Sequence, residues 1–269
     1  MKNILAEVVE KRKATVQQLK NVMPMEAWKK MPLYNRKCLS LQKSLLNETG
    51  TGIIAEFKRA SPSKGIINAA ADVYEVVSGY ELHGAAAASI LTEPLYFKGN
   101  NDDIIGIRDG INIPILRKDF VFDEYQIAES KALGADVILL IASSLSAKEV
   151  KRLATFANNI GLEVLLELHD EEELDHICDA TTIIGINNRN LKTFEVDIDR
   201  SLRMAEKIPA EKIKVAESGI NSVENIFLFK QHGFKGFLIG ENFMKAPDPT
   251  IAFAAFVHQL KNSSSFGGG

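Results

Sequence analysis

The sequence predicts a single (β/α)8 barrel (TIM barrel), an α/β fold in which eight parallel strands alternate with helices around a closed sheet. Short apolar runs rich in β-branched residues recur eight times, and most are followed by a stretch of helical periodicity. Their starts lie roughly 20 to 34 residues apart, which leaves room for one strand, one loop and one helix. The chain has 269 residues, close to the usual length of about 250 for this fold. An open doubly wound sheet is the alternative, but it does not require eight units.

Residues 1–50 precede the first strand and are predicted to form a helical extension that packs on the barrel. Ile4, Val8 and the pair Val16 and Leu19 recur at helical spacing, and a second short helix is expected over Ala27–Lys30. The barrel itself is expected over residues 51–261. Residues 262–269 are rich in serine and glycine and are predicted to be a disordered tail.

The eight repeating units can be located in the sequence from their expected strands. The strands are expected to begin at Ile53, Ala87, Ile113, Asp136, Glu163, Ile183, Ile213 and Gly236. The clearest helical patterns are Val73–His83, Glu124–Leu133, Ala147–Asn159, Glu171–Cys178, Arg200–Lys207, Val223–His232 and Ile251–Leu260. Residues suited to capping precede several of them, namely Asp72, Asp123, Ser146, Asp170 and Asn221. The helix of the second unit, near Asp102–Asp109, is the least defined.

Composition excludes several classes of protein. Hydrophobic residues make up 46% and charged residues 25% of the chain, which is typical of a soluble globular protein. The formal net charge of −3 gives no basic field for nucleic acid, and no apolar run approaches the ~20 residues that span a membrane. Lys11, Arg12 and Lys13 interrupt any signal-peptide core. With only Cys38 and Cys178, we expect a cytoplasmic protein without a disulfide framework.

The end of the first strand carries the most informative residues. Glu56 and Lys58 stand two residues apart, and on a strand this spacing points both side chains to the same face. A carboxylate and an ammonium on one face of a core strand are costly unless they lie at its open end. The polar loop after them contains Ser61 and Pro62 and is suited to holding an anionic substrate. A surface salt bridge followed by a turn is the simpler interpretation.

The other strands end in the same way. Active sites of such barrels lie at the C-terminal ends of the strands. There the sequence places Thr92, Glu93, Lys118, Glu167, Asn187, Arg189, Glu217 and Glu241, whereas the fourth strand stays apolar through Leu139 and Ile141. Two lysines and three glutamates around one rim predict a charge network in which pKa values are pushed apart. Alone, Lys118 could be a surface lysine, and His169 reads as a neighbour of a helix cap.

The last two units suggest a phosphate site. Ser218 and Gly219 close the seventh strand and Gly240 closes the eighth. Glycine lets backbone N–H groups approach an anion, and phosphate sites in these barrels often follow strands seven and eight. Tight turns are the alternative explanation. The five histidines have no mutual metal-ligand spacing, and neither a Walker motif nor a Gly-x-Gly-x-x-Gly motif is present.

With these residues in place, the chain resembles the indole-3-glycerol phosphate synthase family of tryptophan biosynthesis from about residue 1 to 260. The segments that carry the resemblance are Ile54–Gly65 (IAEFKRASPSKG), Ser89–Phe97 (SILTEPLYF), Pro114–Phe120 (PILRKDF), Gly134–Ile141 (GADVILLI), Gly161–His169 (GLEVLLELH), Ile184–Leu191 (IGINNRNL) and Val215–Ile220 (VAESGI). The resemblance implies a carbon–carbon lyase that converts 1-(2-carboxyphenylamino)-1-deoxyribulose 5-phosphate to indole-3-glycerol phosphate, with loss of CO2 and water. It implies no cofactor and no metal. From charge and hydropathy we expect no nucleic-acid partner and no membrane partner, and we expect a monomer or a weak homodimer.

The resemblance also implies roles for residues. It makes Lys118 the general acid on the carbonyl oxygen and Glu167 the general base and charge stabiliser. Lys58 contacts the substrate carboxylate and assists dehydration, and Glu56 orients the lysines. Asn187 and Glu217 hold polar groups at the ring-closing centre. The phosphate region maps to Ser61, Lys58, Ser218, Gly219, Gly240 and Glu241. The aromatic pocket maps to Pro62, Phe97, Phe120, Leu139, Arg189 and Leu191.

The sequence departs from the family pattern at Asn190, where aspartate is usual, and in the alanine runs 69–71 and 85–88. Phosphoribosylanthranilate isomerase is the nearest competing enzyme, but it would need a cysteine at the end of the first strand. A Schiff-base aldolase that uses Lys118 is a second possibility, and a catalytically inactive barrel kept as a binding subunit is a third. The intact set of Lys58, Lys118 and Glu167 argues against the inactive barrel.

Overall fold

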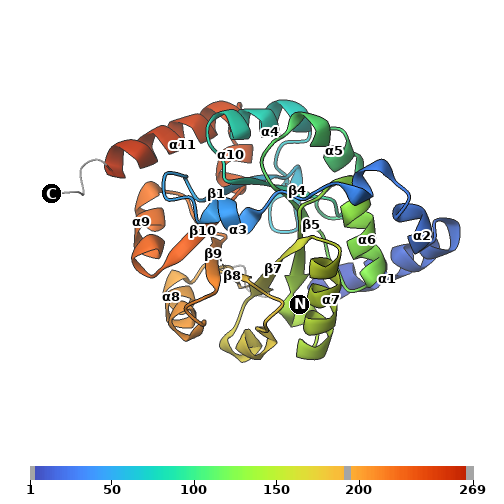
Figure 1. Ribbon diagram of the computed structural model, residues 1–269. Coiled ribbons are helices and arrows are strands. Elements are labelled where there is room, and N and C mark those ends of the chain that lie inside the picture. The colour runs from blue at the N-terminus through green and yellow to red at the C-terminus, as the bar shows by residue number, and fades with distance from the viewer. Residues whose placement is uncertain (1–3, 191–194, 265–269) are drawn as a thin grey trace.

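The computed structural model describes residues 4–190 and 195–264. Eight parallel strands form a closed barrel in the order β1-β10-β9-β8-β7-β6-β5-β4 (Figure 1). They are β1 (Ile53–Phe57), β4 (Ala87–Leu91), β5 (Ile115–Lys118), β6 (Val137–Ile141), β7 (Glu163–Leu168), β8 (Ile183–Asn187), β9 (Ile213–Glu217) and β10 (Phe234–Ile239). Because β1 pairs with both β4 and β10, the sheet has no edge, and the predicted barrel is confirmed over the open sheet.

Helices surround the barrel as expected from the alternating pattern. They are α4 (Val73–Leu82), α5 (Asp102–Ile105), α6 (Glu124–Leu133), α7 (Ala147–Asn159), α8 (Ile198–Lys207), α9 (Val223–Gln231), α10 (Glu241–Met244) and α11 (Pro249–Ser264). Short 3-10 helices complete the connections: η2 (Arg108–Gly110), η3 (Ala142–Ser144) and η4 (Glu171–His176). After β1, strands β2 (Ala60–Ser61) and β3 (Gly65–Ile66) form a small antiparallel hairpin in the loop.

Several boundaries differ from the prediction. The segment expected as helix 171–178 is the 3-10 helix η4, and Asp170 makes no side-chain cap there. The cap of α9 is Ser222 rather than Asn221, because the Ser222 hydroxyl accepts a hydrogen bond from the backbone N–H of Asn225. Strand β5 begins after Pro114, which has no N–H to give to the ladder. Helix α11 continues through Ser264, so the boundary expected at 261 falls inside it, and residues 265–269 lie outside the described part.

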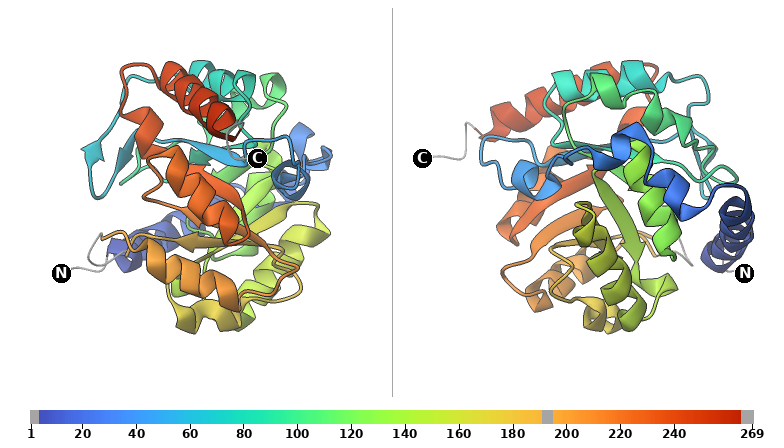
Figure 2. Two further views of the ribbon diagram at one scale, coloured as in Figure 1. Left: turned by 90° about the vertical axis from the view of Figure 1, so that its left-hand side faces the viewer. Right: turned by 45° about the vertical axis from the view of Figure 1, so that its right-hand side comes forward.

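Most of the N-terminal segment lies outside the ring of strands and helices, and its last helix covers one end of the barrel (Figure 1). It comprises α1 (Ile4–Val22), α2 (Met25–Trp28), η1 (Pro32–Asn35) and α3 (Leu41–Leu45). Figure 2 shows α1, in dark blue, at the periphery of the barrel, where it contacts α6 and η3. Trp28 is buried with its ring edge-on to Tyr125 of α6, at 6.3 Å between centroids. This segment therefore packs on the barrel through buried aromatic contacts.

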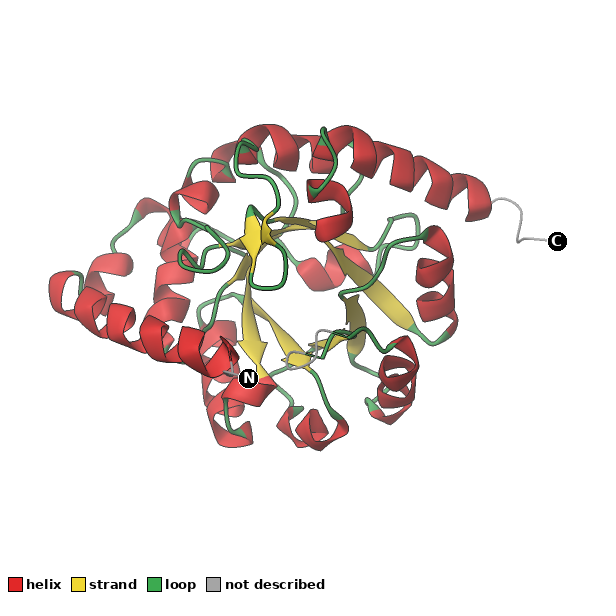
Figure 3. Ribbon diagram, turned by 180° about the vertical axis from the view of Figure 1, so that it is seen from behind, coloured by secondary structure: helices red, strands yellow, loops and turns green. Residues whose placement is uncertain are grey.

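The barrel interior is filled by one set of alternating side chains. Ile54 of β1, Leu116 of β5 and Leu165 of β7 belong to the inner core, and Leu41 and Leu45 of α3 close its bottom. Their chain neighbours point outward, into the larger core between the strands and the helices. Figure 3 shows the opposite mouth of the barrel, where the strands end in loops. No helix of the described residues is both long and apolar enough to cross a membrane.

Candidate active site

A cavity of about 220 Å³ opens at the C-terminal ends of the strands. The sequence-predicted residues that line it are Glu56, Lys58, Ser61, Pro62, Phe97, Lys118, Phe120, Leu139, Glu167, Asn187, Arg189, Ser218, Gly219, Gly240 and Glu241. Glu217 is buried beside them and contacts Lys118. Leu191 lies outside the described residues. The structure thus brings together in one cavity residues from all eight strands or the loops that follow them.

The period of two in the strands explains this convergence. In β1, Ile54 faces the inner core, so Glu56 is the next inward position and Lys58 follows just beyond the strand. In β5, Leu116 faces inward and Lys118 follows it. The same two-residue step leads from Leu165 to Glu167 in β7. The charged side chains therefore form one layer directly above the apolar filling of the barrel.

Lys118 occupies the centre of this charged layer. Its Nζ lies 2.7 Å from Glu217 Oε2, 3.7 Å from Glu167 Oε2 and 3.8 Å from Glu56 Oε2. Burial alone would lower the pKa of the Lys118 ammonium, but the three carboxylates outweigh burial and raise it. Lys58 pairs with the other oxygen of Glu56, at 2.5 Å. Lys118 is consequently a charged donor throughout the neutral pH range.

Glu217 differs from the other two carboxyl groups. Burial raises its pKa to about 7, despite the opposing pull of Lys118 and with a further increase from the charge of Glu167. Its Oε1 is buried and has no hydrogen-bond partner among the described residues, so the carboxyl group is paired only through Oε2, with Lys118. A Cβ on Gly185 would lie 2.2 Å from that oxygen, so only glycine at this position in β8 leaves room for the Glu217 side chain.

Glu167 is held through one of its two oxygens. Asn187 Nδ2 donates to Glu167 Oε1 at 2.9 Å, and His169 Nε2 lies 3.0 Å from the same atom. Burial would raise the pKa of the Glu167 carboxyl, but Lys118 and His169 outweigh burial and lower it. Glu167 is therefore an anion, and its Oε2 faces Lys118 across the cavity.

The corner of the cavity formed by β1, β9 and β10 has the features of an anion site. Ser218 and Gly219 have φ values of +66° and +70°, a left-handed turn in which glycine is favoured. Gly240 stands at the start of α10, and Ser61 lies in the hairpin after β1. The Glu241 carboxylate points to cations of this region, with Lys64 at 3.5 Å and Arg189 at 3.6 Å. Arg189 also donates to the Ser63 hydroxyl.

An apolar wall lies on another side of the cavity. The rings of Phe97 and Phe120 lie 6.3 Å apart, and Leu139 and Val8 add aliphatic surface. Glu93 fixes the loop of Phe97, because its carboxylate accepts the backbone N–H groups of Leu95, Tyr96 and Phe97. Val8 belongs to α1, so the N-terminal helix contributes directly to the cavity.

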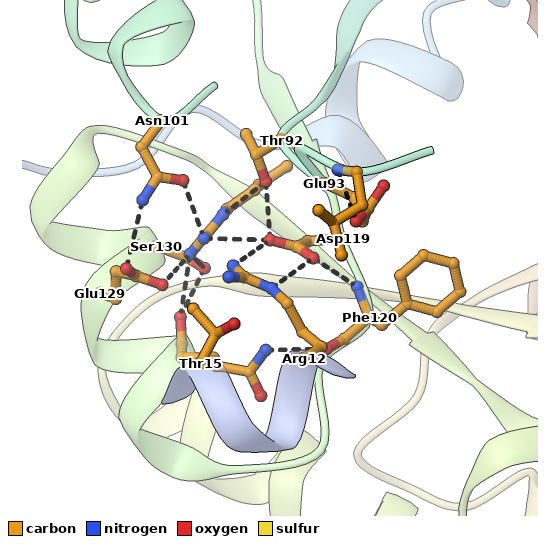
Figure 4. Close-up of polar contacts among 12 residues, drawn as sticks. Arg12, Thr15, Thr92, Glu93, Asn101, Asp119, Phe120, Glu129 and Ser130 are labelled. Carbon is orange, nitrogen blue, oxygen red and sulfur yellow. Dashed lines mark hydrogen bonds and ion pairs between the residues drawn. The ribbon is translucent and has the colours of Figure 1, made fainter. Parts of the chain in front are cut away.

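A buried polar network stands behind this wall (Figure 4). The Asp119 carboxylate accepts two bonds from the Arg12 guanidinium, at 2.6 and 3.1 Å, one from the Thr92 hydroxyl and one from the Phe120 amide. Arg117 joins the network from β5, 3.2 Å from Asp119. Asp119 thereby connects α1 and β4 to the loop that follows Lys118.

Three of the residues that sequence reasoning did not assign to the site bear directly on it. Asp119 and Val8 contact the cavity, and His169 contacts Glu167. His169 could have been found from the sequence, since it stands two positions after Glu167 on the same strand face. Asp119 and Val8 could not, because their place depends on where α1 docks.

Comparison with known proteins identifies the family of this chain. The family model described as indole-3-glycerol phosphate synthase matches residues 5–256. The chain belongs to the indole-3-glycerol phosphate synthase family. It is 45% identical over 261 residues to the indole-3-glycerol phosphate synthase of Aliarcobacter butzleri, covering 96% of this chain and 99% of that one. The family member of Bacteroides thetaiotaomicron is 43% identical over 261 residues, with 97% and 100% covered.

Solved structures of other barrels share the fold of this family member. The 3-hexulose-6-phosphate synthase from Salmonella typhimurium matches with a TM-score of 0.63 at 11% identity, covering 78% of this chain and 99% of that one. A mutant tryptophan synthase α-subunit from Pyrococcus furiosus matches with a TM-score of 0.60 at 17% identity, covering 78% and 98%. At these identities the likeness concerns the barrel alone.

Proposed function

We propose that the cavity converts 1-(2-carboxyphenylamino)-1-deoxyribulose 5-phosphate to indole-3-glycerol phosphate, with Lys118 and Glu167 as the principal catalytic residues. The chain is a carboxy-lyase of tryptophan biosynthesis, as its family membership establishes. The observation that carries the assignment of residues is the position of Lys118 Nζ, surrounded by Glu217, Glu167 and Glu56 at the floor of the cavity.

Ring closure requires an acid on the substrate ketone. The ring carbon that bears the carboxylate attacks the carbonyl carbon, and the carbonyl oxygen becomes a hydroxyl by taking a proton from Lys118. The three carboxylates keep the ammonium charged until negative charge develops on that oxygen. Glu167 stabilises the positive iminium that forms at the substrate nitrogen.

The next steps restore aromaticity. The bond from the ring carbon to the carboxylate breaks, and its electron pair flows to the iminium as CO2 leaves. The hydroxyl then departs as water, with a proton from Lys58, while Glu167 removes a proton from the adjacent carbon. Lys58 and Glu167 both line the cavity. Lys58 pairs with Glu56 and Glu167 faces Lys118, so the two residues are suited to transfer protons at neighbouring substrate atoms. Glu56 orients both lysines, since each of its oxygens faces one of them.

The two ends of the substrate differ in chemistry, as do the two sides of the cavity. The phosphate fits the corner formed by Ser61, Ser218, Gly219, Gly240 and Glu241. Glu241 would contribute its backbone, because its carboxylate is paired with cations. Lys58 adds positive charge there. The carboxyphenyl ring fits the wall of Phe97, Phe120, Leu139 and Pro62, with Arg189 at its edge. Leu191 stays a sequence-based candidate for the same wall.

An assay of the purified protein tests this proposal. Indole-type fluorescence should appear when the protein is mixed with the substrate. Most of this signal should be lost in the variant Glu167→Gln, which preserves the size of the side chain and removes its charge. We expect a large fall in kcat with KM nearly unchanged, because the carboxylate acts on charged intermediates. A change confined to KM would make Glu167 a binding residue. Trapping of a substrate adduct by borohydride would instead support Schiff-base chemistry at Lys118.

A further inference from the structure

We propose that His169 is a positioning residue for Glu167: it holds one carboxylate oxygen and leaves the other free to act on the substrate. The inference rests on the proposed role of Glu167 as general base. The roles assigned above do not use His169, although it is one of the most buried ionisable groups near the cavity, with 5% of its surface exposed.

The geometry separates the two oxygens of Glu167. Oε1 is approached by Asn187 Nδ2 at 2.9 Å and by His169 Nε2 at 3.0 Å. The histidine N–H does not point along a hydrogen-bond direction, so this contact is a close ion pair. Oε2 faces Lys118 Nζ at 3.7 Å, beyond hydrogen-bond distance. The carboxylate is thus fixed through Oε1, and Oε2 is the oxygen with capacity to accept a proton.

The position of the imidazole is itself fixed. His169 directly follows β7, and the step of two residues puts its side chain on the same face as Glu167. Its backbone N–H donates to Glu173 Oε2 of η4 at 2.6 Å. Glu167 lines the cavity whereas His169 does not, so the histidine supports the carboxylate without contacting the substrate.

Charge also favours an imidazolium at this place. The groups that act on His169 are Glu167 of β7, Glu173 of η4, with its Oε2 3.9 Å from Nδ1, and Glu217 of β9. Lys118 of β5 is the cation on the far side of Glu167. Burial alone would lower the pKa of the imidazole, but the three carboxylates outweigh burial and raise it. An imidazolium would be a third cation opposite Glu56, Glu167 and Glu217, beside Lys58 and Lys118.

A cation at Oε1 keeps Glu167 ionised, so the test is the pH profile of kcat. In His169→Leu the cation beside Oε1 is lost, and the pKa of Glu167 should rise. We expect the acid limb of the kcat profile to move up by about 1 pH unit, with kcat at neutral pH reduced about tenfold and KM within about twofold. His169→Asn offers a neutral N–H group to Oε1 in place of the cation and should restore part of kcat.

A double variant separates positioning from a general structural role. If His169 acts through Glu167, adding His169→Leu to Glu167→Gln should lower kcat no further. An additional loss in the double variant, or an unmoved acid limb in both His169→Leu and His169→Asn, would overturn the proposal. If His169→Leu fails to fold, His169→Asn with and without Glu167→Gln gives the same two readouts.

His176 supplies a matched control. It lies on η4, has its own carboxylate partner in Asp175 at 2.6 Å and does not line the cavity. His176→Asn should leave the acid limb in place. Near-normal turnover of Glu167→Gln alone would refute the proposed base. A normal pH profile in His169→Leu beside an inactive Glu167→Gln would refute only the positioning role.

Discussion

Lys118 illustrates how one side chain is tuned by its neighbours. Three carboxylates surround its ammonium in a buried layer, and the free energy of this arrangement depends on the charge being present. In Lys118→Met, a side chain of similar length carries no proton to the ketone oxygen. We expect kcat to fall by at least ~100-fold, the usual contribution of a general acid. Steady-state kinetics on a variant with a parental circular-dichroism spectrum checks this, and near-normal turnover would remove Lys118 from the role.

Glu217 predicts an unusual dependence of stability on pH. The folded carboxyl group has a pKa of about 7, whereas the ordinary value is 4.5. Between these values the folded state binds more protons than the unfolded state, so this group makes stability fall as pH rises. Glu217→Gln lacks that effect. We expect the free energy of unfolding of the variant, relative to that of the parent, to be higher at pH 8 than at pH 5 by up to about 3 kcal/mol.

Urea titrations at the two pH values measure this gain. The exposed Glu48 offers the control, because Glu48→Gln should follow the parent at both. Parallel pH profiles of Glu217→Gln and the parent would show that the carboxyl group is ionised throughout.

At the scale of single residues, the sequence predicted much of the site, because side chains along a strand alternate between its two faces. The rule that placed Glu56 and Lys58 on one face also applies to Glu167 and His169, which the structure puts 3.0 Å apart. The rule places side chains but does not count the charges that meet. The contact of His169 with Glu167 becomes informative only when the number of carboxylates in the layer is known. Gly185 is a similar case, since the need for glycine there comes from Glu217 on the neighbouring strand.

Among the elements, α1 was expected to pack on the barrel, but the sequence did not predict where it docks. Its helical spacing is readable, but its docking depends on partners about a hundred residues away. Arg12 reaches Asp119 with 7% of its side chain exposed, whereas Lys20 reaches Asp123 with 35% exposed. Both ion pairs attach α1 to the segment between β5 and α6, and they differ mainly in how deeply they are buried.

This difference predicts unequal losses of stability. Arg12→Met leaves the buried Asp119 carboxylate without its bidentate partner and should cost about 3 kcal/mol, although Arg117 retains part of the pairing. Lys20→Met should cost less than about 1 kcal/mol, because water solvates both groups. Denaturant unfolding of the two variants compares them, and equal losses would mean that the Asp119 network is dispensable for stability.

The element boundaries show where local signals compete. Asp72, Asp123 and Ser146 cap their helices as the sequence suggests, each accepting a backbone N–H of the first turn. At α9 two candidates stand side by side: Ser222 caps the helix, while the backbone N–H of Asn221 donates to Asn225 Oδ1. At η4 three consecutive glutamates follow an aspartate without a side-chain cap, and the α-helix is replaced by a 3-10 helix.

The barrel as a whole creates the proposed phosphate corner. Ser61 follows β1, Ser218 and Gly219 follow β9, and Gly240 follows β10, so these residues are neighbours only because β10 pairs with β1. The count of eight units predicted that closure. It could not predict the left-handed turn at Ser218 and Gly219, where two consecutive residues have positive φ.

The phosphate corner makes a prediction about affinity. Inorganic phosphate should compete with substrate, and Gly219→Ala should raise KM about tenfold with a smaller effect on kcat, because a Cβ limits the approach of the anion to the backbone. The new Cβ would also lie 2.4 Å from Val196 Cγ1, in a turn with φ of +70°. A rise in KM could therefore come from a collision with Val196 instead of from the anion site.

Val196→Ala removes the atom that the new Cβ would meet, so it supplies the control. Alone, this partly exposed change should leave KM near the parental value. In the double variant Gly219→Ala/Val196→Ala the collision is relieved, and the weakened phosphate binding should persist, as should the weakened inhibition by inorganic phosphate. If the double variant recovers the parental KM and phosphate inhibition constant, the defect lies in the packing of the loop. The anion would then bind elsewhere, and the orientation of the substrate in the cavity would have to be reversed.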